Sequence, residues 1–469
     1  MKNHRQISAC LVSLALFAGC SSAPRLPDGT PRPGSHEVVS LIGSSKVHRY
    51  TLDNGLRLLV VEDHSSPTFA YQTWVRVGSR DEVRGRTGLA HLFEHMMFKG
   101  TTKHPNGEFE RTLDAAGAEG TNAYTTRDYT VYVQELPVAS RQGKEKDPKA
   151  IDSLDLIMSL ESDRMVNLIV NDQSFKTEVE VVQNERRMRY ENNPDGMLYH
   201  TLWETAFTTH TYRTPVIGLA EDLAAMSSED ARAFYKSYYS PNHATIIVSG
   251  DVDPDEVHEK ARKHFGLLPR AESPVRVIDA EPPQTAPRRK ALKLPQQTEK
   301  LFIAYHIPSV MHEDIPALGM LSMVLGSGRT SRLYRALVET GIATDVGVDQ
   351  MDDKDPSLFL VSATLQKGKR AAVAESVILK EIARISRDPV SSAELERAKN
   401  RMSFWFVAGL DSNNEKAHYL GHYETVAGDF QHGLRLYKST LAATPEQIQA
   451  AAAKYLDARN RTTVTGAPK

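Results

Sequence analysis

Cysteine is nearly absent from this sequence. Its only two cysteines, Cys10 and Cys20, lie close to the N-terminus, so nothing after Cys20 can form a disulfide within the chain. A disulfide-stabilised body is therefore excluded. An excess of charge of one sign is also absent, because 57 lysines and arginines face 59 aspartates and glutamates, for a net charge of -2. This balance gives no indication of a nucleic-acid partner, and we expect none.

Long apolar runs are missing too, except near the N-terminus. No later stretch is long and apolar enough to span a bilayer. Residues 1–19 place Lys2 and Arg5 ahead of a short apolar run, which is the pattern of an export signal peptide. Residues 17–20, Phe-Ala-Gly-Cys, resemble a bacterial lipobox, which implies cleavage before Cys20 and lipidation of that cysteine. An ordinary secretory signal cleaved nearby is the alternative.

The expected location follows from this N-terminus. Ser21, rather than aspartate, follows the cysteine, and by the same resemblance this favours sorting to the outer membrane. We therefore expect a cell-envelope lipoprotein that faces the periplasm. Four prolines and two glycines lie between Ser21 and Glu37. Residues 20–40 are accordingly predicted to be a flexible, lipid-anchored tether.

Strand-like runs rich in β-branched and aromatic residues occur in both halves of the body. They cover residues 57–63, 70–78, 129–136, 244–253, 301–308 and 357–366. Apolar residues at helical spacing follow them in each half. These helical stretches include residues 151–165, 175–182, 370–386, 392–409 and 445–456.

The two halves are separated by a stretch rich in proline and charge, residues 266–290. We expect an N-terminal domain at 41–268, a linker at 269–290 and a C-terminal domain of similar fold at 291–469. The predicted fold class is α+β, with two similar domains that are each a mainly antiparallel sheet with helices packed on it.

The strongest chemical signal is GLAHLFEHMMFKG, residues 88–100. His91 and His95 are four residues apart, so on a helix they lie on one face and their imidazoles can share one cation. Glu94 lies on the neighbouring edge, close enough to take a proton from a water at the metal. Catalytic zinc has three protein ligands and leaves one position for water. Two histidines on an amphipathic helix without a metal are the alternative, so a third ligand is the necessary test.

Two glutamates are the best candidates for completing the site. Glu178 and Glu185 are seven residues apart, so they lie two turns apart on one helix face. That face borders an apolar stripe that contains Phe175 and Val182. Carboxylates beside a buried stripe are costly unless a cation satisfies them. The alternative is a solvated face, assisted by the arginines that follow in residues 186–189.

The order HxxEH and then ExxxxxxE resembles the insulinase and pitrilysin family of zinc metallopeptidases, the inverzincins, in a short two-domain bacterial form. The segments LDNGLRLLV, YYSPNHATIIVSGDVDPDEV and VLGSGRTSRLYRAL extend the resemblance over most of the chain. The resemblance implies one Zn²⁺ per chain with His91, His95 and Glu185 as ligands. It also implies that Glu94 is the catalytic base and that Glu178 supports the ligands from outside the coordination sphere.

A third segment, GTNAYTTRDYTVY at residues 120–132, resembles the family's edge strand, where a substrate backbone pairs by strand addition. The resemblance implies that Asn122 and Ala123 lie beside the scissile bond of a peptide substrate. Ordinary packing of this strand within a sheet is the alternative.

The second half departs from the family pattern. Val338 and Thr344 stand where active members carry an arginine and a tyrosine, which bind the substrate and stabilise the oxyanion. The family's large members also have four such domains in one chain. The resemblance therefore implies a related subunit that supplies the missing pair, or a homodimer. The expected function is zinc-dependent endopeptidase, hydrolysing peptides or unfolded segments. A non-catalytic, metal-binding chaperone or assembly subunit of the same fold is the alternative.

Overall fold

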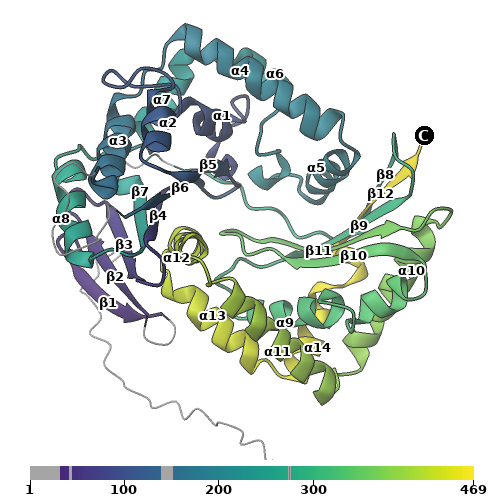
Figure 1. Ribbon diagram of the computed structural model, residues 1–469. Coiled ribbons are helices and arrows are strands. Elements are labelled where there is room, and N and C mark those ends of the chain that lie inside the picture. The colour runs from purple at the N-terminus through teal and green to yellow at the C-terminus, as the bar shows by residue number, and fades with distance from the viewer. Residues whose placement is uncertain (1–31, 42–44, 139–150, 273, 275) are drawn as a thin grey trace, which may run out of the picture.

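The computed structural model of the protein describes residues 32–41, 45–138, 151–272, 274 and 276–469. The predicted signal peptide and Cys20 lie outside the described residues. Two sheets, each with helices packed against it, form the body (Figure 1). The predicted α+β fold is confirmed. Within the described residues, no helix is both long enough and apolar enough to cross a membrane.

The first sheet has seven strands and carries the predicted peptidase segments. Neighbouring strands are antiparallel except for one parallel pair, β3 with β7. In spatial order they are β1 (His36–Ser40), β2 (Lys46–Thr51), β3 (Arg57–Glu62), β7 (Ala244–Gly250), β4 (Thr68–Val75), β6 (Thr130–Pro137) and β5 (Glu119–Thr125). Strand β5, from the predicted substrate segment, is an edge strand.

The second sheet has five strands and repeats this design. Its single parallel pair is β8 with β12. In spatial order the strands are β10 (Ala343–Gln350), β11 (Ser357–Leu365), β9 (Lys300–Ile307), β12 (Arg461–Pro468) and β8 (Arg288–Leu294). Read from its other end, this order matches β3-β7-β4-β6-β5 of the first sheet strand for strand. The two domains therefore share one topology, as the sequence predicts.

Helices cover both sheets. Beside the first sheet lie α1 (Leu89–Met96), α2 (Glu108–Ala115), α3 (Ser153–Asn167), α4 (Asp172–Arg186), α6 (Ala220–Ala225), α7 (Ser228–Tyr238) and α8 (Pro254–Phe265). Beside the second lie α9 (Ile315–Gly326), α10 (Ala371–Arg387), α11 (Ser392–Ala408), α13 (Gln431–Ala442) and α14 (Pro445–Tyr455).

Each half also contributes one helix to the other half's sheet. Helix α12 (Asn413–Val426) packs on β4 and β7, and α5 (Pro194–Ala206) packs on β8, β9 and β12. Buried Glu424 on α12 accepts hydrogen bonds from Arg49 and Arg57 of the first sheet, each at 2.8 Å. The two halves are therefore held together by reciprocal packing and by a buried charge cluster.

Gly421 is the point of closest approach between α12 and the first sheet. A Cβ atom at this position would lie 2.1 Å from Cε2 of the Trp74 indole. We expect Gly421→Ala to lower the free energy of unfolding by about 1–3 kcal/mol, because overpacking outweighs the helix propensity that alanine gains. Urea denaturation measures this change. Adding Trp74→Leu makes room for the methyl group, so the double variant should lose less than the sum of the single losses. A Gly421→Ala variant as stable as the wild type would contradict this packing.

Two boundaries and several helices differ from the sequence predictions. Residues 36–40, predicted as tether, form β1, where the His36 ring stacks on Tyr50 at a centroid distance of 4.1 Å. Strand β8 begins at Arg288, inside the predicted linker. Helices α12 and α13 were not predicted, and in α12 the polar and aromatic residues lack a regular apolar stripe.

Candidate metal centre

Helix α1 carries both histidines of the HxxEH motif. It begins after Gly88, whose φ of 94° is left-handed, and its other residues Leu89, Leu92 and Phe93 are buried in the core shared with α4 and α7. This packing fixes the rotation of the helix, so His91 and His95 face the same way. Their ring centroids are 5.0 Å apart.

Helix α4 brings both glutamates against α1. Buried Phe175 and Val182 anchor it to the same core, and the face with Glu178 and Glu185 meets the histidines. Oε2 of Glu185 lies 3.7 Å from Nε2 of His91 and 3.3 Å from Nε2 of His95. The structure thus brings together residues that are far apart in the sequence.

The donor set fits a zinc ion. Among the described residues, His91, His95 and Glu185 form the one group whose ligand atoms converge, all within 4.8 Å of one another. Donors at tetrahedral zinc distances of about 2.0–2.1 Å are separated by roughly 3.4 Å, close to the distances seen here. The residues are two imidazoles and a carboxylate, which suit zinc. Their role as ligands stays a prediction.

Glu178 and Lys99 surround His95 from the outside. Oε2 of Glu178 lies 3.5 Å from Nδ1 of His95, and Lys99 donates to the other Glu178 oxygen at 2.8 Å. Glu178 is therefore placed to orient the imidazole, as carboxylates behind ligand histidines do. Nδ1 of His91 is buried and has no such partner among the described residues.

The two histidines differ in protonation. Burial lowers the pKa of His91 to about 4, which keeps its imidazole neutral and able to bind a metal. Burial would also lower the pKa of His95, but hydrogen bonding to Glu178 and Glu185 outweighs it and raises the pKa to about 9. In the absence of a metal the carboxylates therefore hold a proton on His95, and a metal ion would take that proton's place.

Glu94 lies beside the ligands but is held from another direction. The hydroxyl of Thr125 at the end of β5 donates to Oε2 of Glu94 at 2.7 Å. Burial raises the pKa of Glu94, and the Thr125 hydrogen bond only partly offsets that effect. A carboxylate with a raised pKa accepts and releases a proton more readily near neutral pH. This suits the predicted role of Glu94 as a base.

Three further residues support the site, and the sequence analysis did not identify them. The Glu82 carboxylate accepts hydrogen bonds from the N–H groups of Gly88 and Ala90 at 2.8 Å each, so it caps α1. Thr125 holds Glu94, and Arg189 donates to Oε1 of Glu185 at 2.8 Å. Only Arg189 gave a sequence signal, its spacing of four from Glu185.

The predicted substrate residues lie on the edge strand, as expected. Asn122 is exposed, whereas Ala123 is buried and packs into the core beside α1. Oδ1 of Asn122 accepts a hydrogen bond from the Ala123 N–H at 2.9 Å. Both residues lie on the strand whose last residue, Thr125, donates to Glu94.

The second half lacks the corresponding chemistry. Helix α9 lies between β9 and β10, where α1 lies between β4 and β5, and its sequence IPALGMLSMVLG contains no histidine or carboxylate. Val338 ends a π-helical turn and packs partly into the second core. Thr344 is exposed on β10, and its hydroxyl donates to the Thr364 carbonyl at 3.1 Å.

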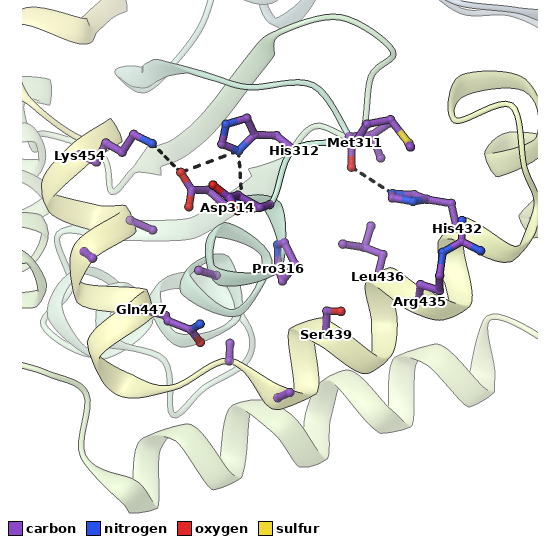
Figure 2. Close-up of a pocket in the computed structure, with 17 residues that line it drawn as sticks. Met311, His312, Asp314, Pro316, His432, Arg435, Leu436, Ser439, Gln447 and Lys454 are labelled. Atoms are coloured by element: carbon purple, nitrogen blue, oxygen red, sulfur yellow. Dashed lines mark hydrogen bonds and ion pairs between the residues drawn. The ribbon is translucent and has the colours of Figure 1, made fainter. Parts of the chain in front are cut away.

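A groove in the second half is a separate feature. Figure 2 shows it between α13, α14 and the chain before α9. Its volume is about 570 Å³. Some of its polar groups are paired with each other or with the backbone: Asp314 accepts from Lys454 at 2.7 Å, and His432 lies 3.1 Å from the Val310 carbonyl. None of its lining residues belongs to the candidate metal centre.

Comparisons with known proteins identify the family of the chain. A family model described as "Insulinase (Peptidase family M16)" matches residues 57–219, and one described as "Peptidase M16 inactive domain" matches residues 225–402. The zinc protease PqqE of Helicobacter pylori is 30% identical over 394 residues, which are 83% of this chain and 85% of PqqE.

Solved structures show the same fold. The crystal structure of a protease from Helicobacter pylori matches with a TM-score of 0.83 and 29% identity, over 93% of this chain and 100% of that one. The periplasmic protease PqqL from Escherichia coli matches with a TM-score of 0.74 and 19% identity, over 92% of this chain but 48% of PqqL. From the family models and the PqqE match, the chain belongs to the insulinase family of peptidases, peptidase family M16.

Proposed function

We propose that this chain is a zinc-dependent endopeptidase that hydrolyses peptides or unfolded segments. The observation that carries the proposal is the convergence of His91, His95 and Glu185 beside Glu94, at the open edge of a β-sheet. A relative that is 30% identical is named a zinc protease, which supports the same reading.

Each side chain has a task in this proposal. Zinc, when bound by the three ligands, would supply a Lewis acid that polarises the peptide carbonyl. Glu94 accepts a proton from the attacking water and passes it to the leaving amine. Thr125 keeps the Glu94 carboxylate at the end of β5. A peptide that adds to β5 as a further strand replaces the hydrogen bond between Asn122 and the Ala123 N–H.

The test is hydrolysis by the full-length protein, purified in detergent and loaded with zinc. A library of quenched fluorescent peptides should be cut at internal bonds, and mass spectrometry of the products locates those bonds. Products that come only from the chain ends would contradict endopeptidase action. Zinc binding without any cleavage, even after a related subunit is added, would favour the second candidate, a non-catalytic chaperone or assembly subunit, for which Val338 and Thr344 are the specific observation.

A related subunit that carries the missing arginine and tyrosine is part of the proposal. This chain covers only 48% of PqqL, so that protease contains additional chain of similar length. Loss of one oxyanion donor costs about 10²–10³-fold in kcat. We therefore expect the chain alone to be slow and the added subunit to raise kcat by about this factor, as measured in peptide assays with and without it. A monomer that turns over peptides at about 10 per second by itself would argue against a partner.

Attachment to the outer membrane through Cys20 is the last part of the proposal, and the N-terminal sequence supports it. Mass spectrometry of the mature N-terminus should find a diacylglyceryl group on this cysteine. The Cys20→Ser variant should move from the membrane fraction to the soluble periplasmic fraction. Membrane association that is unchanged in this variant would rule the anchor out.

A further inference from the structure

Arg127 lies in the loop between β5 and β6, two residues beyond the threonine that holds Glu94. Its guanidinium lies over the Trp203 ring, 3.4 Å from the ring centre, and 5.9 Å from that of Tyr199. No described carboxylate lies within ion-pairing distance of it, and its buried Nε has no hydrogen-bond partner. The loop itself is fixed, because the Arg80 N–H donates to the Arg127 carbonyl at 2.8 Å.

Two more unpartnered polar atoms lie on α5, the helix that carries the Trp203 ring. They are Nδ1 of His200 and Nε1 of Trp203, and the Trp203 side chain is 1% exposed. Tyr190 completes the cluster, with its ring centroid 6.0 Å from that of His200. Four neighbouring side chains thus come together with three buried polar atoms that lack partners.

The cluster is rigidly connected to the metal centre. Tyr190 belongs to the π-helical turn Arg187–Glu191, which continues α4, and the preceding residue Arg189 bonds Glu185. Helix α5 touches this turn closely, since a Cβ atom on Gly196 would lie 1.8 Å from the Arg189 carbonyl oxygen. The cluster is therefore anchored at one end to a predicted ligand and at the other to the substrate strand.

Stacking on Trp203 does not use the N–H groups of Arg127. A cation–π contact engages the face of the guanidinium, whereas its donors lie in the plane and form a fork that matches a carboxylate. The positive charge of Arg127 acts on the nearby, buried Asp353. Burial raises the pKa of Asp353, and Arg127 partly offsets that increase. The two side chains form no ion pair. Donors buried without partners are costly, and a ligand that accepts from them removes that cost.

We propose that Arg127, together with Tyr190 and His200, binds a carboxylate of the peptide substrate. This inference rests on the proposed peptidase function and adds to it a preference for peptides that present a carboxylate to Arg127. The carboxylate comes either from an aspartate or glutamate side chain of the peptide or from its C-terminus. Both sources present the same planar anion to the guanidinium fork.

Binding to the full-length, zinc-loaded Glu94→Gln variant tests this proposal without requiring turnover. Fluorescent peptides of one sequence are compared by anisotropy: an amidated peptide without acids, the same peptide with a free C-terminus, and a series with one glutamate moved along it. We expect a glutamate at one register, or the free C-terminus, to tighten Kd by about tenfold to a hundredfold. Which peptide gains identifies the source of the carboxylate.

Variants of Arg127 give the decisive comparison. Arg127→Met should abolish the preference for acidic peptides, so that acidic and neutral peptides bind with equal Kd. Arg127→Lys keeps the positive charge but loses the forked arrangement of donors, so it should retain part of the preference for acidic peptides. It replaces the methionine variant in this test if that variant does not fold. Arg262→Met, at an exposed Arg262–Glu259 pair on α8, is the matched control and should keep the full preference.

Three results would overturn the inference: equal binding of acidic and neutral peptides, a preference that survives Arg127→Met, or no peptide binding at all. Equal binding alongside Glu94-dependent hydrolysis by the wild type would remove only the carboxylate preference. An Arg127-dependent preference without any hydrolysis would remove only the proposed catalysis.

Discussion

Replacing Glu94 with glutamine is expected to lower kcat for peptide hydrolysis by about 10²–10⁴-fold, the usual contribution of a general base. Glutamine has the size of glutamate and can still accept the Thr125 hydrogen bond, so the geometry at the end of β5 should persist. It cannot accept a proton from water. Because Glu94 is not among the three converging ligands, zinc should remain bound at one ion per chain.

Zinc content and kcat measured on the same preparation check this prediction. The matched control is Glu180→Gln, which removes an exposed carboxylate from the opposite side of α4. That variant should keep both zinc and activity. A Glu94→Gln protein that retains more than a tenth of wild-type kcat would show that another group acts as the base. Loss of zinc in that variant would show that Glu94 is a ligand.

Removing Glu185 is expected to have the largest effect on zinc affinity. It lies within 3.7 Å of both histidine Nε2 atoms, whereas Glu178 faces Nδ1 of His95 from behind. Loss of a carboxylate that orients a ligand typically costs 10–100-fold in affinity. We expect Glu178→Ala to fall in this range, roughly 10–100-fold, and Glu185→Ala to lose more.

Competition with a coloured chelator at fixed pH measures both variants, with Glu180→Ala as the control. Which variant loses more zinc affinity shows which glutamate binds the metal directly. If Glu178→Ala weakens zinc binding more than Glu185→Ala, the two glutamates have exchanged roles. Equal and small losses in both variants would mean that zinc does not bind between α1 and α4.

The sequence allowed prediction of the parts that depend on local periodicity. His91 and His95 repeat at one helical turn, and Glu178 and Glu185 at two, so their faces follow from helix geometry alone. The strand-like runs correspond to β3, β4, β6, β7, β9 and β11 within a few residues of their observed ends. Short edge strands such as β1 escaped because their residues are alternately exposed and half-buried, which leaves little apolar signal.

Contacts between distant segments were beyond the reach of such reasoning. Helix α12 packs on the first sheet through Gly421 and through Glu424, whose carboxylate is buried only because two arginines from other strands surround it. Thr125 meets Glu94 because β5 pairs with β6 in one register, which a single sequence does not specify. Arg127 is likewise notable only once Trp203 is known to lie beneath it.

The two halves share one topology but differ in chemistry, because only the first carries the candidate metal centre. The second sheet repeats the topology of five strands of the first, yet α9 is apolar where α1 carries the predicted ligands. The second domain instead covers the first through α12 and receives α5 in return. Its contribution visible in this chain is to position α5, and with it Trp203, beside the loop that follows β5.

The most direct test of the zinc-peptidase account is a titration of zinc into the metal-free, full-length protein while peptide cleavage is followed. The account predicts no cleavage at zero zinc, a cleavage rate that rises linearly with added zinc, and a plateau at one zinc per chain. The Glu94→Gln variant should show no such rise in cleavage. Cleavage by the metal-free protein, or a full complement of bound zinc with no Glu94-dependent cleavage either alone or with the related subunit, would contradict it.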